Sequence, residues 1–130
     1  MTNILVIGAG GVGSSMASIG ETRTFFDSFV LADISEARAE QALAGLEDRG
    51  RFSTARVDAA DRPGIVELAR RVKADVIVNA CDPRFNESIF AAAFEAGCSY
   101  VDMVATGNLI SFSILGFKVL INSSNALRFS

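Results

Sequence analysis

The chain has 130 residues, a formal net charge of −3 and an apolar content of 50%, which is typical of one domain with a packed α/β core. The acidic balance excludes a broad basic face, so we expect no nucleic-acid partner and no binding to an anionic membrane. The absence of histidine excludes Ser-His-Asp hydrolases and most zinc sites, and we expect no metal site.

Residues 1–103 contain no run of about 18 uncharged apolar residues, so a spanning helix is not expected there. The first strand-like run begins at Asn3, and no targeting leader is expected ahead of it. The two cysteines, Cys81 and Cys98, lack a CxxC-type spacing. We therefore expect free, buried thiols and a cytoplasmic location.

Short apolar runs alternate with helix-period segments over the first hundred residues. The runs that predict strands are Asn3 to Ile7, Ser28 to Asp33, about 53–57, 75–80 and 98–103. The segments that predict helices are Gly11 to about Gly20, Ser35 to just before Gly50, a segment opened by Asp61 and Pro63, and a segment from Asn86 or Ser88 to Gly97. This alternation predicts an α/β fold with right-handed crossovers and a parallel sheet covered by helices on both faces.

Two of the expected helices carry an apolar stripe for the core. In the third helix the stripe is Ile65, Leu68, Ala69 and Val72, and in the fourth it is Ile89, Phe90, Ala93 and Phe94.

A glycine-rich turn follows the first strand and precedes the first helix: Gly8-Ala9-Gly10-Gly11-Val12-Gly13. The GxGxxG spacing in this context is the dinucleotide-binding fingerprint of a Rossmann-type, doubly wound domain. Gly8 permits the tight turn, Gly10 lets the backbone approach a pyrophosphate, and Gly13 lets the helix pack close to the sheet. The first N–H groups of the helix, around Gly11 and Val12, would then bind the phosphates.

Asp33 ends the second strand twenty residues after Gly13, where a carboxylate accepts hydrogen bonds from the adenosine ribose. Its charge would repel a 2′-phosphate, so we expect NAD as the cofactor. NADP is not excluded, because Arg38 lies just inside the next helix.

Two further strand ends point to the same crevice. Asp58 follows the third strand, where it would flank the adenine, and Ala80 follows the fourth strand, where a small side chain lets the cofactor approach. We interpret Asp82 as a turn or cap residue, and Pro83 as stiffening the exit from the strand. No residue is assigned a catalytic role.

The phrases Val6 to Gly13, Leu31 to Asp33, Asp75 to Ala80 and Ala96 to Met103 together resemble the saccharopine dehydrogenase-like family. The last phrase, with Tyr100 and Asp102, resembles that family's Gly-x-x-Tyr-hydrophobic-Asp strand. The resemblance covers residues 3–103 and implies an NAD(P)-binding domain of an oxidoreductase acting on C–N bonds in amino-acid or polyamine metabolism. It also implies that the glycine turn holds the pyrophosphate, Asp33 the ribose and the Ala80 turn the nicotinamide half.

Residues 104–130 differ from the rest: they contain no Asp or Glu, and only Lys118 and Arg128 are charged. Leu109 to Leu115 and Phe117 to Ile121 are compatible with strands or with a buried helix. We expect the nucleotide-binding domain to end at 103, and residues 104–130 to be an atypical apolar tail, either a sixth strand or sequence not native to the family, as in a truncated gene product.

The expected function is dinucleotide binding without substrate turnover by this chain, with a homodimer as a further option. The alternative is a stand-alone regulatory module that senses nucleotides. For Tyr100 and Asp102 a core position and a cap at the strand end are favoured over catalysis.

Overall fold

We analysed a computed structural model of the chain, which describes residues 2–102, 104–106, 109–114, 117–122 and 127–129, with side chains for residues 2–102. The strands of the first hundred residues are β1 (Asn3–Ile7), β2 (Ser28–Asp33), β3 (Phe52–Arg56), β4 (Val76–Asn79) and β5 (Ser99–Asp102). The helices are α1 (Gly11–Gly20), α2 (Glu36–Leu43), α3 (Arg62–Arg71) and α4 (Asn86–Ala96), with a short 3-10 helix η1 (Pro83–Phe85).

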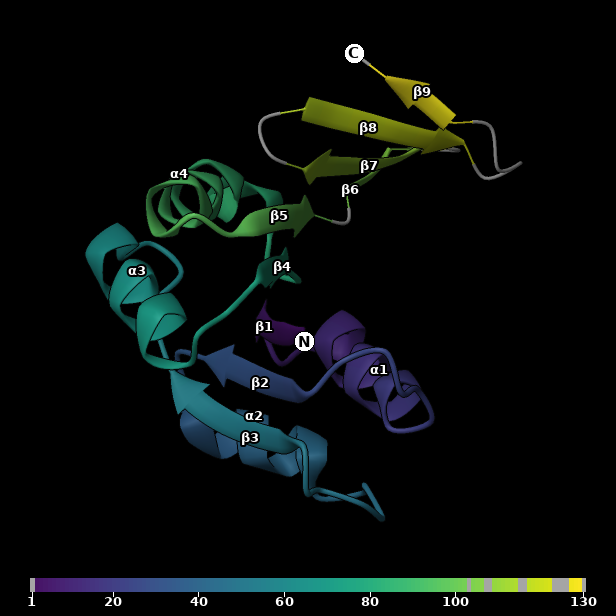
Figure 1. The fold of residues 1–130 in the computed structure, drawn as a ribbon, viewed down its shortest axis with the longest axis vertical. Coiled ribbons are helices and arrows are strands. Elements are labelled where there is room, and N and C mark those ends of the chain that lie inside the picture. Colours follow the sequence, from purple (N-terminus) through teal and green to yellow (C-terminus); the bar gives the residue numbers. More distant parts are fainter. Residues whose placement is uncertain (1, 103, 107–108, 115–116, 123–126, 130) are drawn as a thin grey trace.

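The five strands form one parallel sheet in the order β3-β2-β1-β4-β5 (Figure 1). β1 lies at the centre, where Ile7 pairs with Ala32 of β2 and with Asn79 of β4. The strand order reverses between β1 and β4, and the carboxyl ends of these strands meet there. The Rossmann-type, doubly wound fold predicted from the sequence is therefore confirmed, and its switch point lies after Ile7.

The sheet has a hydrophobic core on each face, because successive side chains of a strand point to opposite sides. Leu5 and Ile7 of β1 pack in the core that contains α3 and α4. Ile4 and Val6 pack in the core that contains α1 and α2. The buried residues of β1 thus serve both layers, as the continuous apolar run of this strand predicted.

Helix caps occur where the sequence predicted them. The Ser35 hydroxyl accepts a hydrogen bond from the Arg38 N–H at 3.3 Å, and the Asp61 carboxylate accepts one from the Gly64 N–H at 3.2 Å. Gly97 follows α4 with a left-handed φ of 75°.

Two expectations about the helices are wrong. α2 ends at Leu43 instead of just before Gly50, because side chains satisfy the backbone beyond it: the Asp48 N–H donates to Glu21 and the Gly50 N–H to Asp48. Phe94 is 76% exposed and does not belong to the inward stripe of α4.

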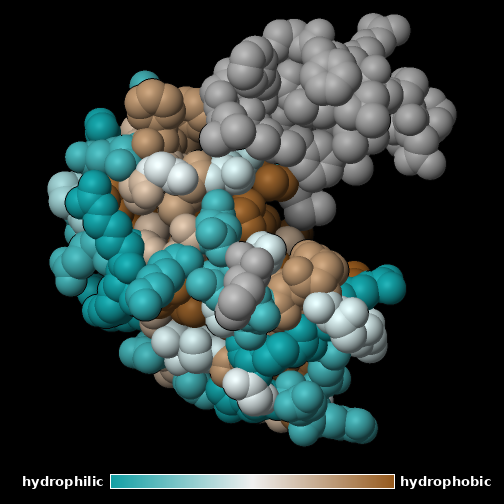
Figure 2. Space-filling model, viewed as in Figure 1, coloured by the Kyte–Doolittle hydropathy of each residue, from teal (hydrophilic) through white to brown (hydrophobic). Residues whose placement is uncertain are grey.

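The other three residues of the predicted stripe do pack on the core. Ile89 and Ala93 are buried and Phe90 is partly buried. Ala92, which is buried, and Ala96, which is partly buried, belong to the same face but were not predicted. On the face drawn in Figure 2, hydrophilic residues predominate over α3 and the lower part of the molecule, whereas apolar residues lie at the surface over α4.

The C-terminal part forms strands β6 (Val104–Thr106), β7 (Leu109–Ile114), β8 (Phe117–Asn122) and β9 (Leu127–Phe129). They pair in a separate antiparallel sheet in the order β6-β7-β8-β9 (Figure 1). Among the strands that the structure describes, none of these four joins the parallel sheet. The assignment of residues 104–130 as a tail foreign to the domain stays a prediction.

The central position of β4 predicts a large effect of truncating its buried side chain. Ile77→Ala should lower the free energy of unfolding by about 2–5 kcal/mol, because Ile77 is fully buried and its removal leaves a cavity. Urea denaturation followed by circular dichroism measures this change. Ile34→Ala is the matched control, since Ile34 is 57% exposed, and equal losses for the two variants would contradict the placement of β4.

Candidate functional site

The turn between β1 and α1 passes very close to the turn that follows β4. Gly8 has a φ of +114°, and its N–H donates to the Ala32 carbonyl at 2.8 Å. A Cβ atom at Gly8 would lie 2.8 Å from the Ala80 carbonyl oxygen. Both the conformation and the lack of space therefore require glycine at this position.

The start of α1 folds back over the same turn. A Cβ atom at Gly13 would collide with the carbonyl oxygen of Gly8. Gly10 is the N-cap residue, and no side chain caps the N-terminus of α1. The space around Gly11 is open and Val12 is 47% exposed. The first-turn N–H groups of α1 thus lie beside this turn without a side-chain cap, an arrangement that suits phosphate groups.

Asp33 ties the end of β2 to the glycine turn. One carboxylate oxygen accepts from the Ala9 N–H at 2.9 Å and the other from the Ser35 N–H at 3.0 Å. The residue is only 7% exposed. In this structure Asp33 holds the turn and the start of α2 in place, in addition to bordering the crevice.

A cavity of about 330 Å³ lies at the carboxyl ends of the strands. Its wall combines apolar residues, among them Phe85, with Gly8 and the charged residues Asp33, Arg38, Asp58 and Arg84. The structure thus brings Gly8, Asp33 and Asp58, which were predicted separately along the sequence, to one cavity. The Asp58 carboxylate also accepts from the Ala60 N–H at 2.9 Å, which shapes the turn after β3.

Arg38 reaches toward the glycine turn. Its terminal guanidinium nitrogen would lie 3.3 Å from a Cβ atom built on Gly10. Arg84 also lines the cavity, where its guanidinium lies 4.8 Å from the centre of the Phe85 ring and 3.9 Å from an Asp82 carboxylate oxygen. Two cations and the two carboxylates Asp33 and Asp58 thus border the cavity, and the uncapped N-terminus of α1 beside it suits an anionic group.

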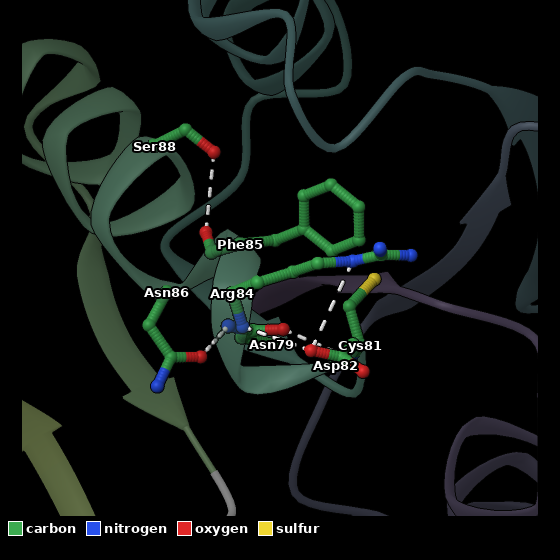
Figure 3. A network of polar contacts seen from close by, with 7 residues as sticks. All are labelled: Asn79, Cys81, Asp82, Arg84, Phe85, Asn86 and Ser88. Carbon is green, nitrogen blue, oxygen red and sulfur yellow. Dashed lines mark hydrogen bonds and ion pairs between the residues drawn. The ribbon is translucent and has the colours of Figure 1, made fainter.

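The turn after β4 packs on the end of β1. The Ala80 N–H donates to the Ile7 carbonyl at 2.9 Å, and the Cys81 thiol donates to the same carbonyl at 3.2 Å. Asp82 caps η1 by accepting from the Arg84 N–H at 3.0 Å, which confirms its predicted role as a cap (Figure 3).

The Cys81 thiol lies in the cavity wall and is held in its neutral form. Burial, and secondarily the nearby Asp33 carboxylate, raise the pKa of Cys81 to about 11. Since the thiolate is the nucleophilic form, Cys81 is a poor nucleophile at neutral pH.

A buried polar network lies behind this turn. The Tyr100 hydroxyl donates to Asp102 and accepts from the Asn79 side-chain amide, both at 3.1 Å. Tyr100 is 2% exposed and its ring packs edge-on against Phe90 at 5.3 Å, which confirms the predicted core position. Burial raises the pKa of Tyr100, so the hydroxyl keeps its proton.

The predictions from the sequence did not include Arg84, Phe85 or the hydrogen bond between Asn79 and Tyr100. Arg84 follows a strand end at the crevice, and this position was the signal that could have identified it. Within the described residues, no group of three acidic, Cys or His side chains is arranged to hold a metal ion. No described helix is both long and apolar enough to cross a membrane.

Comparison with known families and proteins gives a consistent result. The family model of the saccharopine dehydrogenase NADP binding domain matches residues 4–125. The carboxynorspermidine synthase of Vibrio cholerae is 29% identical over 117 residues, which are 84% of this chain and 28% of that protein. The carboxyaminopropylagmatine dehydrogenase of Synechocystis is 30% identical over 102 residues, which are 78% of this chain and 25% of that protein.

Solved structures share the fold. Apo saccharopine dehydrogenase (L-Glu forming) from Saccharomyces cerevisiae superposes with a TM-score of 0.69 at 14% identity, over 82% of this chain and 22% of that chain. A short-chain dehydrogenase/reductase from Veillonella parvula, in complex with NADP, gives a TM-score of 0.62 at 13% identity, over 82% of this chain and 48% of that chain. The chain thus spans about a quarter of the length of the curated relatives it matches. The family model that it matches describes a domain for a nicotinamide dinucleotide cofactor.

The contact between Gly13 and Gly8 predicts a marked difference between two neighbouring glycines. Gly13→Ala should lower the free energy of unfolding by about 1–3 kcal/mol, because its Cβ atom collides with backbone. Gly11→Ala, the matched control, should be neutral or slightly stabilising, because the space there is open. Thermal or urea unfolding measures the stability of both variants. If Gly13→Ala were as stable as Gly11→Ala, the result would contradict the described turn.

The raised thiol pKa of Cys81 predicts slow alkylation. In a Cys98→Ala background, Cys81 should react with iodoacetamide at pH 8 roughly tenfold or more slowly than an ordinary thiol. The rate should keep rising with pH toward a midpoint near 11, provided that the protein stays folded. At a pH below the ordinary pKa of a thiol, the neutral form of Cys81 stabilises the folded state. This contribution to stability is lost as the pH rises through about 11. A midpoint near 9 would contradict the burial of this thiol.

Proposed function

The chain belongs to the saccharopine dehydrogenase NADP-binding domain family, and we propose that it binds NADP(H) as the cofactor half of an oxidoreductase. The observation that carries the proposal is the backbone contact among Gly8, Gly13 and Ala80, which leaves the crevice at the switch point open to a pyrophosphate. In this proposal the N–H groups of Gly10 to Gly13 bind the pyrophosphate and Asp33 borders the ribose. Asp58 flanks the adenine side, and the Ala80 turn borders the nicotinamide half.

The site residues fit such a ligand by shape and charge. Glycines occupy the positions where a side chain would fill the turn, and the two cations of the cavity complement phosphate charge. When bound, the nicotinamide group supplies hydride transfer, while the protein supplies binding and orientation.

We propose NADP in place of the NAD expected from Asp33 alone. The family match is described as an NADP-binding domain, which supports this choice. So do the contacts of Asp33, because both of its oxygens already accept backbone N–H groups, whose dipoles partly offset the field of the carboxylate. Arg38 then remains at the cavity edge as a partner for a 2′-phosphate, whereas Arg84 already pairs with Asp82 at 3.9 Å.

The substrate class follows from the relatives. A carboxynorspermidine synthase and a carboxyaminopropylagmatine dehydrogenase are among them, so we propose a whole protein that acts on C–N bonds in polyamine or amino-acid metabolism. For residues 1–130 we propose cofactor binding without turnover, because the chain spans about a quarter of these relatives. The relatives favour this reading over a stand-alone nucleotide sensor. A cytoplasmic location and a homodimer remain predictions.

The arginine at the glycine turn predicts a selective effect on cofactor affinity. Isothermal titration should show tighter binding of NADPH than of NADH. Arg38→Gln should lower the affinity for NADPH by about tenfold and change the affinity for NADH by less than about twofold. The reason is that the substitution removes a charge-assisted contact to the 2′-phosphate.

Arg71→Gln is the matched control for that experiment, since Arg71 is exposed on α3, away from the cavity. It should leave both affinities unchanged. A folded wild-type chain that binds neither dinucleotide would overturn the proposed function. Binding of NADH in preference to NADPH would overturn only the choice of cofactor.

A further inference from the structure

We infer that Tyr100 is a positioning residue for the dinucleotide site: acting through Asn79, its buried hydroxyl fixes the turn from Ala80 to Asp82. The inference rests on the proposed function, in which this turn borders the nicotinamide half of the cofactor. Tyr100 itself lies in the core, behind the turn, and its hydroxyl belongs to a hydrogen-bond chain that runs from β5 to β4.

The direction of each hydrogen bond in this chain follows from the chemistry of its members. An ionised Asp102 carboxylate only accepts, so the Tyr100 hydroxyl donates its one proton to it at 3.1 Å. The hydroxyl must then accept from Asn79, which places the Asn79 NH₂ group toward Tyr100 at 3.1 Å. The second hydrogen of this NH₂ group is donated to the side-chain Oδ1 of Asn86 at 2.7 Å.

The orientation of Asn79 is thereby fixed, and it determines the start of the turn. With the NH₂ group directed inward, the Asn79 Oδ1 faces the other way and accepts from the Cys81 N–H at 2.9 Å (Figure 3). A flipped amide would set its oxygen against the Asn86 oxygen and its NH₂ group against the Cys81 N–H. Asn79 is 2% exposed, so water does not substitute for these partners.

The turn held in this way is the one that packs on the glycine turn. The Ala80 N–H and the Cys81 thiol both donate to Ile7, and the Ala80 carbonyl lies against Gly8. A displacement of the Ala80–Cys81 peptide would therefore change the wall of the crevice at β4. The adenine side, formed after β2 and β3, has its own hydrogen bonds through Asp33 and Asp58.

The start of α4 shares the network. Asn86, the first residue of α4, accepts from Asn79. The Ser88 hydroxyl donates to the Ala59 carbonyl at 2.6 Å and lies 3.2 Å from the Phe85 carbonyl, which is its alternative acceptor. The segment after β4 is thus anchored on both sides of Arg84. Removal of the Tyr100 hydroxyl leaves one Asn79 N–H without an acceptor in the core and loosens the anchor nearest to Ala80.

The test compares two ligands that differ in the nicotinamide group. For Tyr100→Phe in the full chain, titration calorimetry should show NADPH affinity about five- to tenfold lower, and 2′-phospho-ADP-ribose affinity within about twofold of wild type. Asn79→Leu removes the same link from the other end and should give the same selectivity, so it serves if Tyr100→Phe does not fold. Hydrogen exchange of the Cys81 amide should become about tenfold faster in either variant, with or without ligand.

Phe90→Leu is the matched control, because Phe90 packs on the ring of Tyr100 but has no part in the hydrogen-bond chain. It should keep both affinities and the Cys81 exchange rate near those of wild type. Two results for Tyr100→Phe would overturn the inference: an equal loss of affinity for both ligands, or no change in either affinity. An unchanged exchange rate of the Cys81 amide would also overturn it. Failure of wild type to bind either ligand would instead overturn the proposed function.

Discussion

The close contact between two backbone turns is the constraint on which the rest of the site depends. The β1–α1 turn at Gly8 lies against the carbonyl of Ala80 on one side and beneath Gly13 of α1 on the other. No side chain larger than hydrogen fits at either glycine without a shift of backbone. Because these three segments are so close, the N-terminus of α1 sits directly over the point where the strand order of the sheet reverses.

The polar groups around this contact hold it from both sides. Asp33 connects the turn to β2 and to the start of α2, and Asn79 connects the β4 turn to the buried Tyr100. Each of these side chains is nearly fully buried and hydrogen-bonded, which makes its position specific. The N-terminus of α1, Arg38 and Arg84 border the open part of the crevice, where we propose that the anionic ligand binds.

Much of the fold could be predicted from the sequence because local signals agree with one another there. The strand runs, the caps Ser35 and Asp61 and the glycine turn all act over a few residues. The errors occur where distant contacts decide. α2 stops early because Glu21 and Asp48 satisfy the following backbone. Phe94 faces outward because the core lies against the face of α4 that carries Ala92 and Ala96. The network from Asp102 to Cys81 could not be predicted, because it depends on the register of β4 against β5.

The most direct test of the account is to map the binding site of NADP⁺ by two-dimensional NMR of the ¹⁵N-labelled chain. The account predicts that the largest amide shift changes occur at Gly10 to Gly13, at Arg38 and at Ala80 to Arg84. Amides of the α3–α4 groove around Val66 and Glu95, which lies on the outer side of these helices, should change little. Changes confined to that groove, or none in a folded sample, would contradict the central claim.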